Sequence, residues 1–119
     1  MAGLNQMAKD LGAAIGRTDE YRALQRAIQA ADEDRTFVEA RSELQTLEGQ
    51  MEADLRAGKE LSEEIKGSYE GLMDRIQVNS KYQRVVASQS NFEKLMARVN
   101  AVIGDGMKEG GKSRIVLAP

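Results

Sequence analysis

The spacing of apolar residues constrains the fold of this chain more than any other feature of its sequence. Across residues 37–55, apolar side chains recur at alternating intervals of three and four, with only the last one place late. A repeat near 3.5 residues puts one apolar stripe along a helix and is the signature of coiled-coil packing. We therefore predict a long helix here that lies along a partner helix. The stripe consists of Phe37, Ala40, Leu44, Leu47, Met51 and Leu55.

The same alternation returns towards the C-terminal end. It predicts a helix from Ser80 to Ile103, about 36 Å long at roughly 1.5 Å per residue. Ser80 and Gln83 match a capping box, which specifies where that helix begins. A glutamine, Gln89, interrupts the stripe; we interpret it as fixing register and partner number, or alternatively as facing a groove where another protein docks. The stripe consists of Tyr82, Val85, Gln89, Phe92, Met96, Val99 and Ile103, widened by Val86, Leu95 and Val102.

Three shorter helical patterns fill the rest of the chain. The first covers residues 4–15, with Leu4, Met7, Leu11, Ala14 and Ile15 on one face. Thr18 is suited to cap a second helix, and Ser62 a fourth. The acidic residues 32–34 mark a turn, and Gly58 ends the helix that precedes it in the chain. Strand signals are nearly absent, so we predict an all-α fold: an elongated antiparallel bundle or hairpin of about five helices, two of them long and coiled-coil-like.

The segment 105–119 departs from this pattern. Its glycines predict a flexible tail that follows a single helical domain at residues 4–104. The tail closes on a short apolar, β-prone stretch that is suited to docking on a neighbour; a frayed terminus is the alternative. The candidate docking residues are Ile115, Val116 and Leu117.

Composition restricts the chemistry open to the chain. It has no histidine and no cysteine, which removes the commonest general base, the commonest zinc ligands and disulfide bonds. We predict no catalytic, cofactor-binding or metal-binding residues, no cofactor and no enzymatic activity. We also find no signal peptide and no apolar run of roughly 18 residues, so we expect a cytoplasmic protein without a membrane partner.

Two patterns come nearest to enzymatic sites. Acidic residues gather at 32–34 and 63–64, but the helical carboxylate sites of di-iron bundles need Glu-x-x-His pairs. The stretch "GMKEGGKS", residues 106–113, formally matches GxxxxGK[ST]. A phosphate-binding loop requires a preceding strand and a following helix, and the sequence offers neither, so we interpret the match as accidental.

Two or three long helices packed side by side form a thin molecule that leaves apolar flanks uncovered. The simplest cover is a second copy of the chain, so we expect a dimer or larger homo-oligomer. We also expect another protein as a partner. The interface residues that we predict, for self-association or for another protein, are Phe37, Leu44, Leu47, Met51, Tyr82, Val86, Gln89, Phe92, Leu95, Met96 and Val99.

Three stretches within residues 4–104 share a pattern whose most telling residues are Leu11, Ile15, Thr18 to Tyr21, Leu24, Ala27, Gly58, Lys59, Asn79, Tyr82, Phe92, Val99 and Ile103. In these residues the chain resembles the YlbF/YmcA family of small bacterial helical proteins. The resemblance implies an elongated, all-helical subunit that associates with itself or with related subunits. It further implies a regulator in competence, sporulation and biofilm formation, or in an accessory complex that steers an endoribonuclease. Some members bind iron–sulfur clusters through cysteines, a role that a cysteine-free chain does not inherit.

These observations support three hypotheses of function. The first is a non-enzymatic, homo-oligomeric adaptor that regulates by binding another protein, with a role in RNA processing or development implied by the resemblance. The second is a structural scaffold whose C-terminal tail docks on another protein. The third is an RNA-binding module, suggested by basic residues such as Lys94 and Arg98. The net charge of −2 and the lack of interleaved aromatic residues argue against this third class.

Overall fold

The structure is a computed structural model that describes the backbone of residues 2–117 and the side chains of residues 3–112. The described part of the chain is helical, as predicted, and the expectation of about five helices is confirmed. Within residues 2–117, none of these helices is both long and apolar enough to cross a lipid bilayer. The helices are α1 (Ala2–Gly16), α2 (Asp19–Glu33), α3 (Arg35–Arg56), α4 (Glu63–Gln77) and α5 (Ser80–Leu117).

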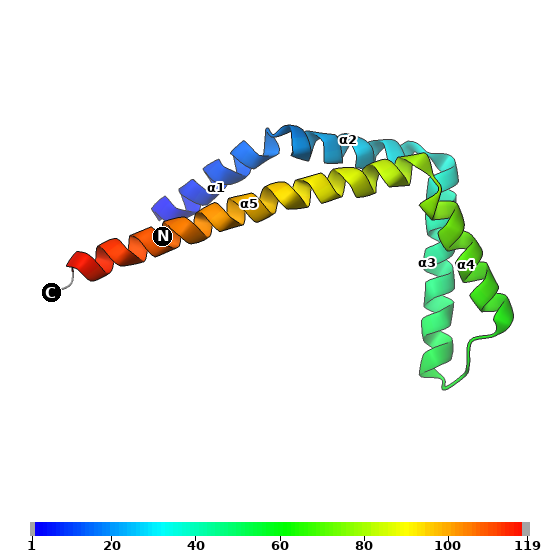
Figure 1. The fold of residues 1–119 in the computed structure, drawn as a ribbon. Helices are drawn as coiled ribbons and strands as arrows, with labels where there is room; N and C mark the ends of the chain where they lie inside the picture. Colours follow the sequence, from blue (N-terminus) through cyan, green and yellow to red (C-terminus); the bar gives the residue numbers. More distant parts are fainter. Residues whose placement is uncertain (1, 118–119) are drawn as a thin grey trace.

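The five helices form two arms that meet at a corner (Figure 1). The long arm consists of α1, α2 and α5, and the hairpin arm consists of α3 and α4. The molecule measures 70 × 36 × 23 Å, with a radius of gyration of 22.1 Å. A compact domain of this length has a radius of gyration of roughly 13.5 Å. The predicted elongated shape is therefore confirmed, and most residues lie near the surface.

Hydroxyl side chains cap two of the helices as the sequence predicts. The Oγ1 atom of Thr18 accepts a hydrogen bond from the backbone N–H of Tyr21 at 3.2 Å, at the start of α2. The Oγ atom of Ser62 accepts from the backbone N–H of Ile65 at 3.1 Å, at the start of α4. Each hydroxyl satisfies a backbone donor that has no partner inside its own helix.

The turn predicted at residues 32–34 is confined to one residue. Asp34 separates α2 from α3, and its side chain accepts a hydrogen bond from the backbone N–H of Phe37 at 3.0 Å. At the other end of α3, Gly58 has a φ of 76°, a conformation that favours glycine. The corner and the tip of the hairpin arm are therefore both set by residues that the sequence singles out.

The predicted capping box at the start of α5 is wrong. Asn79, one residue earlier, is the cap: its Oδ1 atom accepts from the backbone N–H groups of Lys81 at 2.9 Å and Tyr82 at 3.1 Å. Ser80 is already helical, and the amide of Gln83 donates instead to a backbone carbonyl at the end of α4. Asparagine caps helices at least as well as serine, so the earlier residue takes the role.

The predicted end of the last helix near Gly104 is also wrong, because α5 continues to Leu117. Each interior glycine costs about 1 kcal/mol relative to alanine. Extending an existing helix requires no new nucleation, however, and the chain has no proline before its last residue. The backbone at 105–117 is thus helical rather than a flexible linker or a strand. The side chains of Ile115, Val116 and Leu117 lie outside the described residues.

The core lies at the corner, where four helices meet. Phe37 is buried and stacks on Tyr82 of α5, with 5.9 Å between ring centroids. The guanidinium of Arg41 lies 5.2 Å from the centroid of the Phe37 ring, within the range of a cation–π contact. The cluster ties the two arms together; it contains Ala31, Phe37, Ala40 and Ile76, with Leu44, Tyr82 and Val85 packed against it.

Along the long arm, α2 packs against the first half of α5. Ala27 of α2 and Ser88 of α5 are both buried and small, which allows the helices to approach closely. Further along the arm, Tyr21 contacts Phe92, with 5.7 Å between ring centroids. The stripe of α5 therefore meets α2 through Ser88 rather than through Gln89.

Gln89 does not lie in this seam. Its side chain is exposed, and its amide donates to the carboxylate of Glu93 at 3.4 Å. Ser88 keeps the three-four spacing from Val85 to Phe92 equally well, and its small side chain fits the close contact with α2. Within one subunit the predicted seam position of Gln89 is therefore wrong; a role in register between subunits, or in a groove where another protein docks, stays a prediction.

Candidate protein-interaction surfaces

The chain leaves a large area of surface uncovered. Its accessible surface is 9209 Å², whereas a compact monomer of 119 residues exposes roughly 6,400 Å². The difference is roughly 2,800 Å². Among the described residues, ten large apolar side chains are exposed, and six of them lie on the part of the long arm away from the corner.

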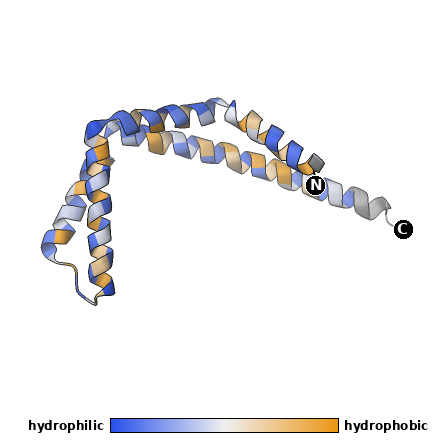
Figure 2. Cartoon of the chain, turned by 180° about the vertical axis from the view of Figure 1, so that it is seen from behind, coloured by the Kyte–Doolittle hydropathy of each residue, from blue (hydrophilic) through white to orange (hydrophobic). Residues whose placement is uncertain are grey.

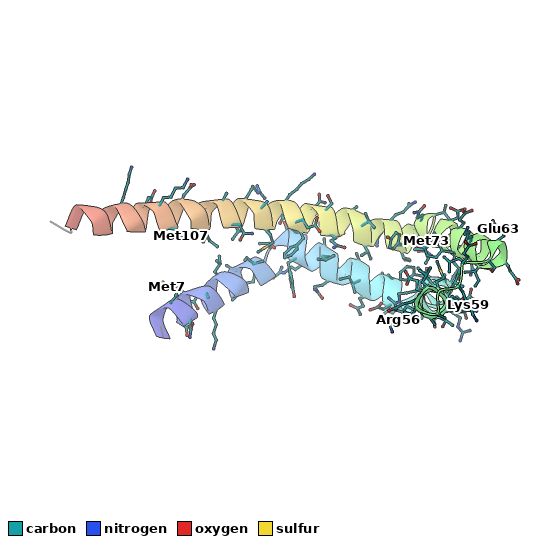
Figure 3. All side chains as sticks on the ribbon, turned by 90° about the horizontal axis from the view of Figure 1, so that it is seen from below. Met7, Arg56, Lys59, Glu63, Met73 and Met107 are labelled. Carbon is teal, nitrogen blue, oxygen red and sulfur yellow. The ribbon has the colours of Figure 1, made fainter. Side chains whose placement is uncertain are left out.

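We call this region the apolar wedge. It lies between α1 and the distal part of α5, where Figure 3 shows the two helices diverging. Figure 2 shows hydrophobic segments along both helices there. An open groove of about 480 Å³ is lined by Leu11 on α1 and by Leu95, Arg98, Val99, Val102 and Ile103 on α5. The wedge comprises Leu4, Met7 and Leu11 of α1, together with Leu95, Val99, Val102, Ile103 and Met107 of α5.

The wedge exists because the apolar stripe of α5 is longer than the helix that covers it. α2 begins at Asp19, after the turn that Thr18 closes by donating its hydroxyl to the backbone carbonyl of Ile15 at 2.6 Å. Before that turn, α1 diverges from α5 (Figure 3) and leaves the facing side chains open. Leu4 is 60% exposed, Val102 68% and Met107 72%.

The wedge carries little charge. Helix α1 has one lysine, Lys9, and one aspartate, Asp10. Arg98 lines the groove, and its guanidinium lies 3.7 Å from the carboxylate of Glu20 on α2. Recognition at this surface must therefore rest on shape and apolar contact rather than on attraction to a strongly charged partner.

A second groove, of about 470 Å³, runs along the hairpin arm. Leu47 of α3 and Leu72 of α4 lie among its lining residues, and Glu39 and Glu43 add acidic side chains. Glu43 also forms an ion pair with Arg75 of α4 at 3.5 Å. This groove is more polar than the wedge; its remaining lining residues are Ser42, Thr46, Gln50 and Ser68.

Two glycines in α4 have no packing reason inside the subunit. A Cβ atom added at Gly67 or Gly71 would meet no other atom within 4 Å. A close helix contact within this chain therefore does not explain them. The glycines weaken α4 locally, by about 1 kcal/mol each relative to alanine.

The structure places the predicted interface residues in several parts of the subunit. Some are used within the subunit: Phe37, Leu44 and Tyr82 in the corner core, and Phe92 against Tyr21. Leu95 and Val99 lie in the wedge, and Leu47 in the hairpin groove. Val86 and Gln89 are exposed on α5, while Met51 and Met96 are half-buried.

The interface prediction left out most of the wedge. Leu4, Met7 and Leu11 follow the same three-four spacing as the longer stripes. That spacing is the sequence signal from which they could be identified as interface residues. Met107 was missed because the predicted linker placed it outside any helix. Their involvement in binding stays a prediction, as does that of the original set.

The sequence patterns that come nearest to enzymatic sites, the acidic residues 32–34 and 63–64 and the stretch 106–113, do not form such a site in the structure. Asp32 pairs with Arg41 at 3.0 Å near the corner. Glu63 pairs with Lys66 at 3.6 Å and lies at the tip of the hairpin arm (Figure 3). The backbone of residues 106–113 is part of α5, so these residues form a helix rather than a phosphate-binding loop.

Comparison with known proteins gives a family and two similar structures. The family model described as "Control of competence regulator ComK, YlbF/YmcA" matches residues 4–108. The Bacillus subtilis RicA structure, solved in complex with RicF, has a TM-score of 0.80 at 17% identity, covering 92% of this chain and 96% of that one. A protein of unknown function (DUF964) from Bacillus stearothermophilus has a TM-score of 0.60 at 19% identity, covering 90% and 94%. No curated protein sequence matches significantly. At these identities the structures show a shared fold.

Proposed function

Because the chain belongs to the YlbF/YmcA family of competence-control regulators, we propose that it is a non-enzymatic regulatory adaptor that acts by binding proteins. The observation that carries the proposal is the uncovered apolar surface on the long arm, because monomeric soluble proteins rarely expose large contiguous apolar patches. The RicA structure, in which a protein of the same fold is held in a complex with RicF, supports the same conclusion.

The two arms suit an adaptor because they offer separate surfaces. The wedge is apolar and nearly uncharged, whereas the hairpin groove has an acidic rim at Glu39 and Glu43. Surfaces of different chemistry select different partners. We propose that homo-oligomerisation uses one surface and a regulated protein uses another, in the cytoplasm. The family description supports developmental regulation as the outcome; a role in RNA processing stays a prediction from the resemblance.

The scaffold hypothesis has less support. It assigns docking to the C-terminal tail, which the sequence predicts to be flexible, whereas the backbone there continues as helix to Leu117. The RNA-binding hypothesis has less support: Lys94 and Arg98 line a depression together with Glu20, whose carboxylate offsets part of their charge. A protein partner therefore fits the described surface best.

The test is affinity capture from host cells after in-cell cross-linking, with the full chain carrying an affinity tag. We expect a defined protein to co-purify with the native chain and to be lost when both hairpin-groove and wedge residues carry charge, as in a Leu47→Glu/Val102→Glu variant. Circular dichroism of the variant should show that its helices are still formed. Capture of no protein above background by a chain that is also monomeric would contradict the proposal, as would capture of RNA alone.

A further inference from the structure

The hairpin arm is only two helices wide. α3 and α4 lie side by side, and within residues 2–117 no third helix runs along them (Figure 1). Two helices cannot enclose the apolar stripes that they share. Leu72 is buried near the corner, whereas Leu47, Met51 and Ile65, nearer the tip, are only half-buried. A third helix laid along the arm would finish covering these side chains.

The groove on this arm has the dimensions of such a helix. On α3 its lining runs from Glu39 to Gln50, a span of roughly 17 Å or about three helical turns. On α4 it is lined by Ser68 and Leu72. Because the groove runs along two antiparallel helices, a third helix can lie in it with its side chains between theirs. An extended peptide would find no sheet edge to pair with, since residues 2–117 contain no strand.

The α4 side of the groove permits close approach. Ser68 has a small side chain, and Gly71, three residues later, lies on the same side of α4. A Cβ atom added at Gly71 would meet nothing within 4 Å inside the subunit. The glycine weakens its helix, and close contact with a helix of another protein is a gain that offsets this cost.

The charge of the arm determines what kind of helix it attracts. Residues 35–77 carry ten acidic and six basic side chains, and two of the acids, Glu39 and Glu43, line the groove. Three of the basic side chains are already paired with acids of the arm, namely Arg56 with Glu52 at 2.6 Å, Lys66 with Glu63 at 3.6 Å and Arg75 with Glu43 at 3.5 Å. The arm therefore attracts a helix that has lysine or arginine beside its apolar stripe, and repels an acidic one.

We propose that the groove between α3 and α4 binds a basic amphipathic helix of the regulated protein, so that three helices pack along the hairpin arm. Apolar side chains of that helix, at three-four spacing, contact Leu47 and Leu72, and its lysine or arginine side chains lie beside Glu39 and Glu43. This inference rests on the proposed function and names the element that the adaptor recognises. The wedge, which carries little charge, is left for self-association.

The first test is photo-crosslinking in host cells with the full chain. Thr46, which lines the groove, is replaced by p-benzoylphenylalanine. The matched control carries the same group in place of Gln45, an exposed neighbour outside the lining and about 100° away around α3. We expect position 46 to be linked to one protein segment, and the link to be lost at position 45. Mass spectrometry should show that this segment has a net positive charge and apolar residues at three-four spacing.

The second test exchanges charges, with a fluorescent synthetic peptide of the cross-linked segment as the probe and the purified full chain as the receptor. We expect Glu39→Lys/Glu43→Lys to weaken binding about tenfold by fluorescence anisotropy. A peptide with glutamate in place of its lysines and arginines should prefer this variant to the native chain. The control Glu48→Lys/Glu52→Lys has the same spacing and change in net charge but lies outside the groove lining, and should weaken binding less than about threefold. Equal losses in both variants would overturn the groove as the site.

The outcomes separate this inference from the proposed function. A segment linked at position 46 that is acidic, lacks the apolar spacing, or belongs to a second copy of this chain overturns the basic helix as occupant, as does a link to RNA. Equal linking at positions 45 and 46, or none at 46, also overturns it, even if affinity capture of the tagged chain still retains a protein. The adaptor function itself fails only if that capture also retains none.

Discussion

The two arms of this molecule contain the same kind of apolar stripe but cover it to different extents. In the hairpin arm, α3 and α4 have one another as partners, and Leu72 and Ile76 are buried. In the long arm, α2 covers only the first half of α5, and the distal stripe opens into the wedge. A three-four repeat thus predicts that a helix has a partner. It does not predict whether that partner belongs to the same chain.

The arms also differ in charge. Residues 35–77, the hairpin arm, carry ten acidic and six basic side chains, whereas residues 80–117, helix α5, carry three acidic and seven basic ones. In the groove of the wedge, Arg98 is the basic residue among apolar lining side chains. The difference indicates that long-range charge favours basic partners at the hairpin arm and acidic partners along α5.

The largest effect is expected where the arms join. Phe37→Ala removes a buried ring that stacks on Tyr82, and we expect the free energy of unfolding to fall by about 3 kcal/mol. Urea unfolding followed by circular dichroism, at one fixed protein concentration, measures this. The control Tyr82→Phe keeps the stacked ring and should change stability by less than about 0.5 kcal/mol. A loss below about 1 kcal/mol in Phe37→Ala would show that the corner does not hold the arms together.

Replacing a pair of glycines with alanine in each arm should distinguish the two arms most clearly. Gly67→Ala/Gly71→Ala in the hairpin arm should raise the free energy of unfolding by about 2 kcal/mol, since each alanine favours helix by about 1 kcal/mol and its Cβ meets nothing. The oligomeric mass should not change.

The matched pair Gly106→Ala/Gly110→Ala should also favour the helix of α5, yet weaken self-association, because the added methyl groups block a close contact between copies. Chemical denaturation and light scattering on both double variants measure the two properties separately. Equal self-association in the two double variants would show that Gly106 and Gly110 do not lie in the interface.

The helix caps should give smaller effects. Asp34→Ala removes the acceptor for the backbone N–H of Phe37 and should cost about 1 kcal/mol. Ser62→Ala removes the corresponding acceptor at the exposed tip, and we expect a cost of about 0.5 kcal/mol. Thermal or urea unfolding of both variants ranks them. A larger loss at the tip would contradict the view that the corner dominates stability.

The ion pair across the hairpin arm should matter least. Glu43 and Arg75 are 57% and 53% exposed, and exposed pairs typically contribute less than about 1 kcal/mol. Glu43→Gln should therefore lower the free energy of unfolding by less than about 0.5 kcal/mol, and added salt should reduce the difference further. A loss of more than about 1 kcal/mol would mean that this pair, rather than apolar packing, closes the hairpin.

The fold was predictable because its signals are local. Thr18, Ser62 and Gly58 end or begin helices through contacts with residues a few positions away, and each was identified from the sequence. The start of α5 at Ser80 was predicted correctly, but its cap was assigned to Ser80 rather than to Asn79, because both are good caps and a sequence pattern does not decide between them. The end of α5 was missed because glycine weakens a helix without stopping it.

The candidate site was less predictable because it depends on how helices are placed relative to one another. Gln89 and Ser88 are neighbours in sequence, and only the packing of α2 against α5 decides which of them is buried. Leu4 and Met7 have an ordinary amphipathic pattern, and only the divergence of α1 from α5 leaves them exposed. The wedge follows from that divergence, which no local pattern in the sequence specifies.

The most direct test of the wedge as a binding surface is hydrogen–deuterium exchange of the native chain, measured by mass spectrometry at low and high protein concentration. We expect protection to rise with concentration in α1 and in residues 95–112 of α5, and to stay constant in α3 and α4. Protection that rises in the hairpin arm instead, or that does not depend on concentration anywhere, would contradict self-association through the wedge.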